Sequence, residues 1–130
     1  MQEILFRGKT IGFEDSKWVY GDLITTDPYR IVDLANGNDS YVFEKTVGQW
    51  TGLIDKNGNK IFEGDIVKCW SEGVKALGEI RQRVDGLWIL YPAFQNNVFW
   101  GLCPLGNGTT TVEVIGNIHD NPKLKGEDEE

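Results

Sequence analysis

The stretch GQWTGLIDKNGNKIFEGDIVKCW, residues Gly48 to Trp70, places a short polar centre between two apolar runs. At that centre, Asn57-Gly58 is a dipeptide that accepts the left-handed backbone geometry of a tight β-hairpin. The flanking runs are rich in the aromatic and β-branched residues that suit a pleated surface. Glu63-Gly64-Asp65 follows, where glycine gives the backbone freedom to bend. The stretch therefore predicts a hairpin, a bend and a further strand, and not a loop built for chemistry.

Short strand-like segments separated by glycine, asparagine and aspartate turns continue on both sides of this hairpin, while helical periodicity is hard to find. The strands expected outside it span residues 4–7, 17–24, 29–34, 41–44, 77–84, 87–91, 98–100 and 109–115. The run at 87–91 is continuously apolar, which predicts burial on both faces. The fold class predicted is therefore mainly β with little helix. Residues 48–125 are expected to form a small SH3-like barrel, and residues 1–47 to supply additional N-terminal strands.

Length and charge place further limits on the chain. A chain of 130 residues fits one domain and can bury a sizeable core without metal or disulfides. The net charge is -7, and the last four residues are all acidic. We expect a single domain over residues 1–125 and a solvated, disordered acidic tail over residues 126–130. An acidic chain argues against nonspecific binding of nucleic acid, which depends on neutralising phosphates, although a local basic face stays possible.

Cysteine usage and hydropathy bear on the compartment. Cys69 and Cys103 are the only cysteines, and no window approaches about 18 uninterrupted apolar residues, the length that spans a membrane. No secretory signal pattern opens the sequence. We therefore expect no membrane partner, a reducing cytoplasmic compartment and two free thiols.

Three segments resemble one known family. Residues 49–67, QWTGLIDKNGNKIFEGDIV, are similar to the signature of the YopX family, whose members typically read Q-Y-T-G-L-x-D-K-N-G-x-x-I-Y-E-G-D-I-V. The closing EVIGNIHDNP, residues 113–122, and the opening FRGK and KWVYGDL, residues 6–9 and 17–23, resemble the family as well. The resemblance covers nearly the whole chain.

The resemblance implies a protein encoded by a bacteriophage or prophage, acting in the cytoplasm of the bacterial host, with a β-rich fold that contains an SH3-like barrel. It assigns no molecular function and carries no catalytic, cofactor-binding or metal-binding residues. Trp50 and Phe62 stand where the family commonly has tyrosine. Because both positions lack the hydroxyl here, we expect both rings to act as packing groups.

Catalytic and metal sites find little support in the residues. His119, the only histidine, precedes Asp120, and a hydrolase would need it near a nucleophile such as Cys69 or Cys103, neither of which lies in a nucleophile motif. The non-catalytic interpretation is favoured, in which His119 is a histidine near the surface at the end of the last strand. One histidine and two distant cysteines also lack zinc-ligand spacing. We therefore expect no catalytic residues, no metal and no cofactor.

The acidic residues and glycines of the central stretch also have structural interpretations. Asp55 belongs to the hairpin turn, where aspartate caps local backbone amides. Glu63 and Asp65 flank a bend, and their spacing is not that of a calcium-binding loop. The glycine pairs at 48–52 and 106–108 match neither phosphate-binding fingerprint.

Candidate binding residues lie in one segment and beside it. Lys68, Arg81 and Arg83 give the segment from Lys68 to Arg83 a local positive charge, and Trp70 and Trp100 are the tryptophans expected to be partly exposed. Aromatic rings between cations can stack on the bases of a single strand. Tryptophan is equally suited to a small β core, because each ring buries a large area.

The sequence thus favours a small, soluble, non-enzymatic protein-interaction module. The expected partner is a protein, including a second copy of the chain as a homo-oligomer, contacted through exposed aromatic or edge-strand surface. The alternative is a nucleic-acid-binding β-barrel that uses the Lys68–Arg83 face, and a hydrolase based on His119 is a third hypothesis.

Overall fold

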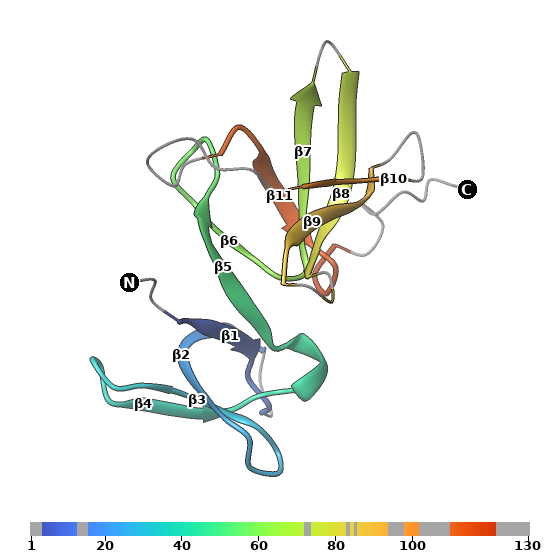
Figure 1. Ribbon diagram of the computed structural model, residues 1–130. Coiled ribbons are helices and arrows are strands. Elements are labelled where there is room, and N and C mark those ends of the chain that lie inside the picture. Colours follow the sequence, from blue (N-terminus) through green and yellow to red (C-terminus); the bar gives the residue numbers. More distant parts are fainter. Residues whose placement is uncertain are drawn as a thin grey trace. The chain divides into compact units, whose positions relative to one another are not determined.

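A computed structural model describes residues 4–12, 16–71, 74–82, 84, 86–93, 98–101 and 110–121. For residues 69–71, 74–76, 91–93 and 98–101 only the backbone is described. The chain forms two compact units, Met1–Trp50 and Thr51–Glu130. Antiparallel strands dominate both units (Figure 1), and the one helical segment in the described ranges is the 3-10 turn η1 (Glu44–Thr46). The prediction of a mainly β chain with little helix is confirmed.

The N-terminal unit is built on four short antiparallel strands. In chain order these are β1 (Phe6–Lys9), β2 (Trp18–Ile24), β3 (Arg30–Asp33) and β4 (Asn38–Tyr41). Each pairs with the next, and β1 also pairs with the start of β5 (Gly48–Ile54). A single bridge between Thr10 and Val42 joins the end of β1 to the end of β4. The sheet therefore curls, which buries Val42 and Ile31 on its inner side.

Gly8 allows a close approach inside this curled sheet. A Cβ atom added at Gly8 would lie 3.0 Å from the Cβ of Val42, which is completely buried. A side chain at position 8 would therefore push β1 away from the segment that follows β4.

The second unit contains a five-stranded antiparallel sheet of order β10-β9-β8-β7-β11. Its strands are β7 (Asp65–Ser71), β8 (Val74–Gln82), β9 (Trp88–Ala93), β10 (Val98–Gly101) and β11 (Glu113–Asn117). Before them, the end of β5 pairs with β6 (Lys60–Phe62). Among the described residues, no pairing closes this sheet into a barrel. The SH3-like detail therefore stays a prediction.

One hydrophobic cluster lies at the centre of the second unit. Register places Val67 opposite Val114 and Ile80 opposite Leu90, so these side chains share one face of the sheet. The cluster consists of Ile61, Val67, Ile80, Leu90 and Val112, with Leu53, Trp88 and Val114 packed against it. At about 25 cal/mol per Å² of buried apolar surface, such a cluster is the main stabilising contribution to a unit of this size.

Burial in β9 and β6 matches the sequence-based expectations. The adjacent residues Ile89 and Leu90 are both buried, so this part of β9 is covered on both faces as predicted. Leu87, in the same apolar run, precedes the strand and is 41% exposed, so the predicted burial does not extend to it. Phe62 is also buried and acts as a packing group, while Trp50 is half-buried.

Several strands differ in extent from the sequence-based expectation, among them β1, predicted at 4–7, and β8, predicted at 77–84. The differences at β4 and β11 have a visible cause. The strand predicted at 41–44 is β4, which begins at Asn38, because Asp33 closes the preceding turn early. Its carboxylate accepts hydrogen bonds from the backbone N–H groups of Ala35 and Asn36. The last strand begins at Glu113 and not at 109, because Thr110 donates its N–H to the carbonyl of Ile54 instead.

Candidate interaction surface

One face of the N-terminal sheet turns its side chains to solvent. Residues directly opposite each other in antiparallel strands share a face. Register aligns Ile24, Arg30 and Tyr41 in one row across β2, β3 and β4, and Asp22, Val32 and Asp39 in the next. Tyr20 has the same parity as Asp22 along β2. We call these seven residues the outer face: Tyr20, Asp22, Ile24, Arg30, Val32, Asp39 and Tyr41.

The outer face combines exposed rings with charge. Tyr20 is 45% exposed and Tyr41 is 53% exposed, and Ile24 is exposed as well. Arg30 donates to the Asp39 carboxylate across 2.8 Å, which holds two strands together at the surface. Aromatic rings of this kind, with an apolar body and a polar tip, are typical of residues that contact another protein.

Exposed apolar side chains gather in the N-terminal unit. Among the described residues, the second unit exposes two large apolar side chains, Val84 and Leu87. The N-terminal unit exposes more: Ile4, Ile11, Tyr20, Ile24, Leu34, Tyr41 and Phe43. The sequence does not predict this surface, because it shows which residues alternate along β2 but not how β2, β3 and β4 pair.

The rim of this surface carries two cations over a ring. The guanidinium of Arg7 lies 4.5 Å from the centre of the Trp18 ring, and the ammonium of Lys9 lies 5.6 Å from it. Lys9 is opposite Trp18 in the pairing of β1 and β2. These cation–π contacts hold Trp18 in place, and the ring is half-buried.

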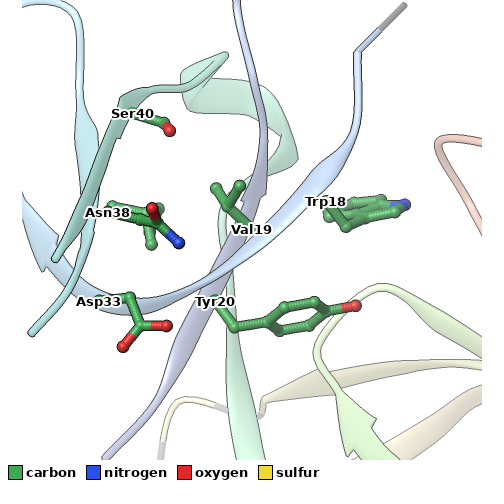
Figure 2. A pocket seen from close by; sticks show the side chains of 7 residues that line it. Trp18, Val19, Tyr20, Asp33, Asn38 and Ser40 are labelled. Carbon is green, nitrogen blue, oxygen red and sulfur yellow. The ribbon is translucent and has the colours of Figure 1, made fainter. Parts of the chain in front are cut away.

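A hollow between β2, β3 and β4 has a volume of about 200 Å³ and is lined by Trp18, Val19, Tyr20, Ile31, Asp33, Asn38 and Ser40. Figure 2 shows Asp33, Asn38 and Ser40 on one side of Val19, with the rings of Trp18 and Tyr20 pointing the other way. It is smaller than the roughly 300–1,000 Å³ of typical ligand pockets. Its carboxylate, from Asp33, already accepts the hydrogen bonds that close the β3–β4 turn. The hollow is therefore a weak candidate for a ligand site.

The Lys68–Arg83 face carries paired charges where it is described. Lys68, in β7, lies 3.8 Å from the Glu113 carboxylate, and Lys56 lies 3.9 Å from the same oxygen. Arg81, in β8, donates to the Glu79 carboxylate across 3.1 Å. Arg81 thus has a carboxylate of its own, and Lys68 shares Glu113 with Lys56, which lowers the positive potential that nucleic acid would meet.

The remaining candidates fall partly outside the described residues. Trp70 and Trp100 lie in β7 and β10, but their side chains are outside the described part, as is Arg83 entirely. Cys69 lies in β7 and its side chain is likewise not described, while Cys103 lies outside the described residues. The predicted exposure of both tryptophans and the two free thiols therefore stay predictions.

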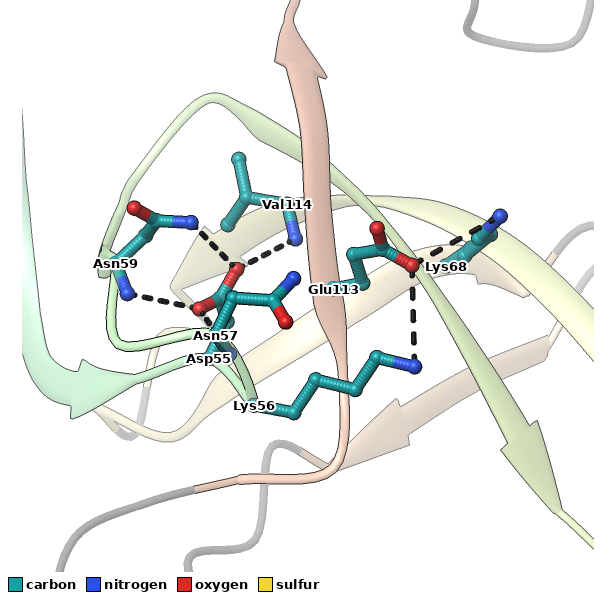
Figure 3. A network of polar contacts seen from close by, with 7 residues as sticks. All are labelled: Asp55, Lys56, Asn57, Asn59, Lys68, Glu113 and Val114. Carbon is teal, nitrogen blue, oxygen red and sulfur yellow. Dashed lines mark hydrogen bonds and ion pairs between the residues drawn. The ribbon is translucent and has the colours of Figure 1, made fainter.

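Asp55 organises the hairpin turn of the central stretch (Figure 3). Its Oδ1 accepts the backbone N–H groups of Asn57 and Asn59 at 2.9 and 2.8 Å. Its Oδ2 accepts the side-chain amide of Asn59 at 3.2 Å and the backbone N–H of Val114, in β11, at 3.0 Å. Asp55 is completely buried. The carboxylate therefore caps the turn, as predicted, and also ties the turn to the last strand.

The electrostatics of Asp55 fit a structural role. Burial raises the pKa of this carboxyl, but the hydrogen bonds just described stabilise its charged form, so its pKa lies below the ordinary value of 3.8. A general acid or base working near neutral pH needs the opposite shift. Asp65 is also buried and accepts the N–H of Phe62 at 2.8 Å, which closes the bend at Gly64.

His119 sits in the turn that follows β11, where it is half-buried. Asn117 closes this turn, because its side-chain oxygen accepts the N–H groups of His119 and Asp120, both at 2.9 Å. In the described part of the chain, no group of three or more histidine, cysteine or acidic side chains could hold a metal ion. No described helix is long and apolar enough to cross a membrane.

The buried Asp55 carboxylate therefore joins the central segment of the family resemblance, residues 49–67, to its closing segment, residues 113–122. Residues 6–125 match the family described as YopX protein. The chain belongs to the YopX family. Comparison with the curated proteins found no match. In this YopX protein, the matched region contains both the outer face and the Asp55 turn.

Proposed function

We propose that this YopX protein is a non-enzymatic protein-interaction module, which binds its partner through the outer face of the N-terminal unit. We place it in the cytoplasm of a bacterial host, encoded by a phage or prophage, as its family suggests. The partner is another protein or a second copy of the chain. The observation that carries the proposal is the pair of exposed tyrosines, Tyr20 and Tyr41, on a sheet face that also presents Ile24.

Several features support this assignment over a nucleic-acid role. Tyrosine supplies a large contact area at low cost in side-chain entropy, so two exposed tyrosines on a rigid sheet are suited to anchor a partner. Arg30 is paired with Asp39 across 2.8 Å, and Arg7 and Lys9 at the rim lie against the Trp18 ring, so these cations already have contacts within the protein. On the Lys68–Arg83 face, by contrast, the described cations are paired with Glu113 and Glu79.

The experiment is affinity capture of the tagged full chain from lysate of phage-carrying host cells, with and without nuclease, read by quantitative mass spectrometry. Wild type is compared with Tyr20→Ser/Tyr41→Ser and with Val84→Ser, an exposed apolar residue of the second unit. We expect partners that survive nuclease and are lost in the double variant alone. Loss of the partners on nuclease treatment would instead support nucleic-acid binding through the Lys68–Arg83 face. Equal capture by all three proteins would remove the outer face as the site.

A further inference from the structure

Two asparagine–glycine steps lie in described turns of this protein. Asn36-Gly37 is in the β3–β4 turn and Asn57-Gly58 is in the β5–β6 turn, and all four residues are exposed. Both glycines have positive φ, 75° at Gly37 and 92° at Gly58. Glycine offers no side chain to shield its backbone nitrogen, so such a step is the place where an asparagine side chain is most open to attack by the following residue.

The reaction in question is deamidation. The backbone nitrogen of the glycine attacks Cγ of the asparagine, forming a C–N bond and losing its proton. The side-chain nitrogen takes up a proton and leaves as ammonia, which gives a five-membered succinimide ring. Water then adds to one of the two ring carbonyls and opens the ring to aspartate or isoaspartate. No oxidant, reductant or cofactor is needed.

The two steps differ in how firmly the fold holds the reacting groups. At Asn36, the side-chain nitrogen donates to the Asp33 carboxylate across 2.8 Å, and the Gly37 nitrogen donates to the Asp33 carbonyl across 2.8 Å. Both the leaving group and the nucleophile are therefore tied to Asp33. The side chain must break a charge-assisted hydrogen bond before it can turn toward the nitrogen.

At Asn57 the constraint is weaker. The Gly58 nitrogen donates to the Asp55 carbonyl across a longer 3.1 Å. The side chain of Asn57 makes no hydrogen bond to any residue that the structure describes, and only its backbone N–H is held, by Asp55. The side chain can thus rotate toward Gly58 while the rest of the turn stays in place.

We propose that Asn57 is a site of spontaneous deamidation in the folded protein, and that it reacts faster than Asn36. The position gives the reaction a structural consequence. Asp55 Oδ1 accepts hydrogen bonds from the backbone N–H groups of Asn57 and Asn59. The main chain of Asn57 forms part of the link between these two donors. Isoaspartate inserts an extra carbon into the main chain between these groups, so the altered turn can no longer present both to one oxygen. The aged protein is therefore less stable than the fresh protein.

The test is to incubate the full chain at 37 °C and mildly alkaline pH, and to follow the mass gain of each peptide by peptide mapping. One sample is native and one is unfolded in concentrated urea. In the native sample we expect Asn57 to react about fivefold faster than Asn36 or more, the factor expected for the additional hydrogen bond that holds Asn36. In urea, where neither turn persists, the two rates should lie within about twofold of each other.

The Asn57→Gln variant serves as the control, since glutamine forms the corresponding ring far more slowly. It should lose the mass gain at that peptide and keep its urea midpoint over the same incubation, while wild type loses stability as it ages. Equal native rates at Asn57 and Asn36 would overturn the proposal, as would an unchanged rate ratio in urea, because local sequence and not the fold would then set the rates.

Discussion

Replacing Asp55 by asparagine tests the role of the buried carboxylate with little change in side-chain shape. Asparagine keeps one acceptor oxygen and loses the negative charge. If that oxygen stays on the N–H groups of Asn57 and Asn59, the new NH2 group occupies the place of Oδ2. It then faces the Val114 N–H, so that two donors point at each other in a buried site.

The cost follows from those contacts. A buried donor left without an acceptor costs about 1–3 kcal/mol, and the hydrogen bonds that remain lose their charge assistance, which adds about 1 kcal/mol. We therefore expect Asp55→Asn to lower the free energy of unfolding by about 3 kcal/mol. With a urea dependence of about 1–3 kcal/mol per M, the unfolding midpoint falls by about 1–3 M. Tryptophan fluorescence during urea titration measures this shift.

The matched control is Asp39→Asn, the same substitution in an exposed ion pair. Asp39 contacts Arg30 at the surface, where such pairs contribute less than about 1 kcal/mol. The two variants should therefore differ clearly in midpoint. A midpoint for Asp55→Asn no lower than that of Asp39→Asn would refute the reasoning that the carboxylate ties the turn to β11.

Three further predictions concern stability. Because the pKa of Asp55 is depressed in the folded state, the unfolded chain binds this proton more tightly. The charged carboxylate therefore stabilises the fold above pH 3.8, and this stabilisation is lost as pH falls through the folded pKa. In acid titrations monitored by circular dichroism, the stability of Asp55→Asn should fall less steeply with pH than that of wild type. Gly21→Ala should cost more than about 2 kcal/mol in thermal unfolding, since its Cβ would meet the carbonyl group of Val32, whereas Gly12→Ala, with open space around it, should change little. Glu113→Gln should lower the free energy of unfolding, measured by urea titration, by less than about 1 kcal/mol, because the two lysines that contact Glu113 are at the limit of pairing distance and partly exposed. A larger loss would mean that these ion pairs contribute substantially to stability.

Local signals in the central stretch were sufficient to predict its structure. Asn57-Gly58 predicted the turn between β5 and β6, and Gly64, with a φ of 94°, occupies the predicted bend. These features depend on backbone preferences of adjacent residues, which a single sequence displays directly. The cap by Asp55 was predicted for the same reason.

Features that depend on distant pairing could not be predicted. The bond from Val114 to Asp55 joins residues 59 positions apart, and no local pattern announces it. The outer face likewise needs the register of β2, β3 and β4, which brings Ile24 and Tyr41 into one row. Sequence reasoning therefore searched for exposed aromatics around Trp70 and Trp100, while the exposed rings that the structure describes lie in the N-terminal unit.

Whether the outer face holds the partner is decided by one affinity comparison on purified proteins. The Kd of the captured partner, or of the chain for itself, is measured by calorimetry for wild type, Tyr20→Ser/Tyr41→Ser and Val84→Ser. We predict that the double variant raises Kd at least about tenfold, as loss of buried aromatic anchors does, and that Val84→Ser leaves it unchanged. An unchanged Kd in the double variant, or equal weakening by both variants, would contradict the assignment of the outer face.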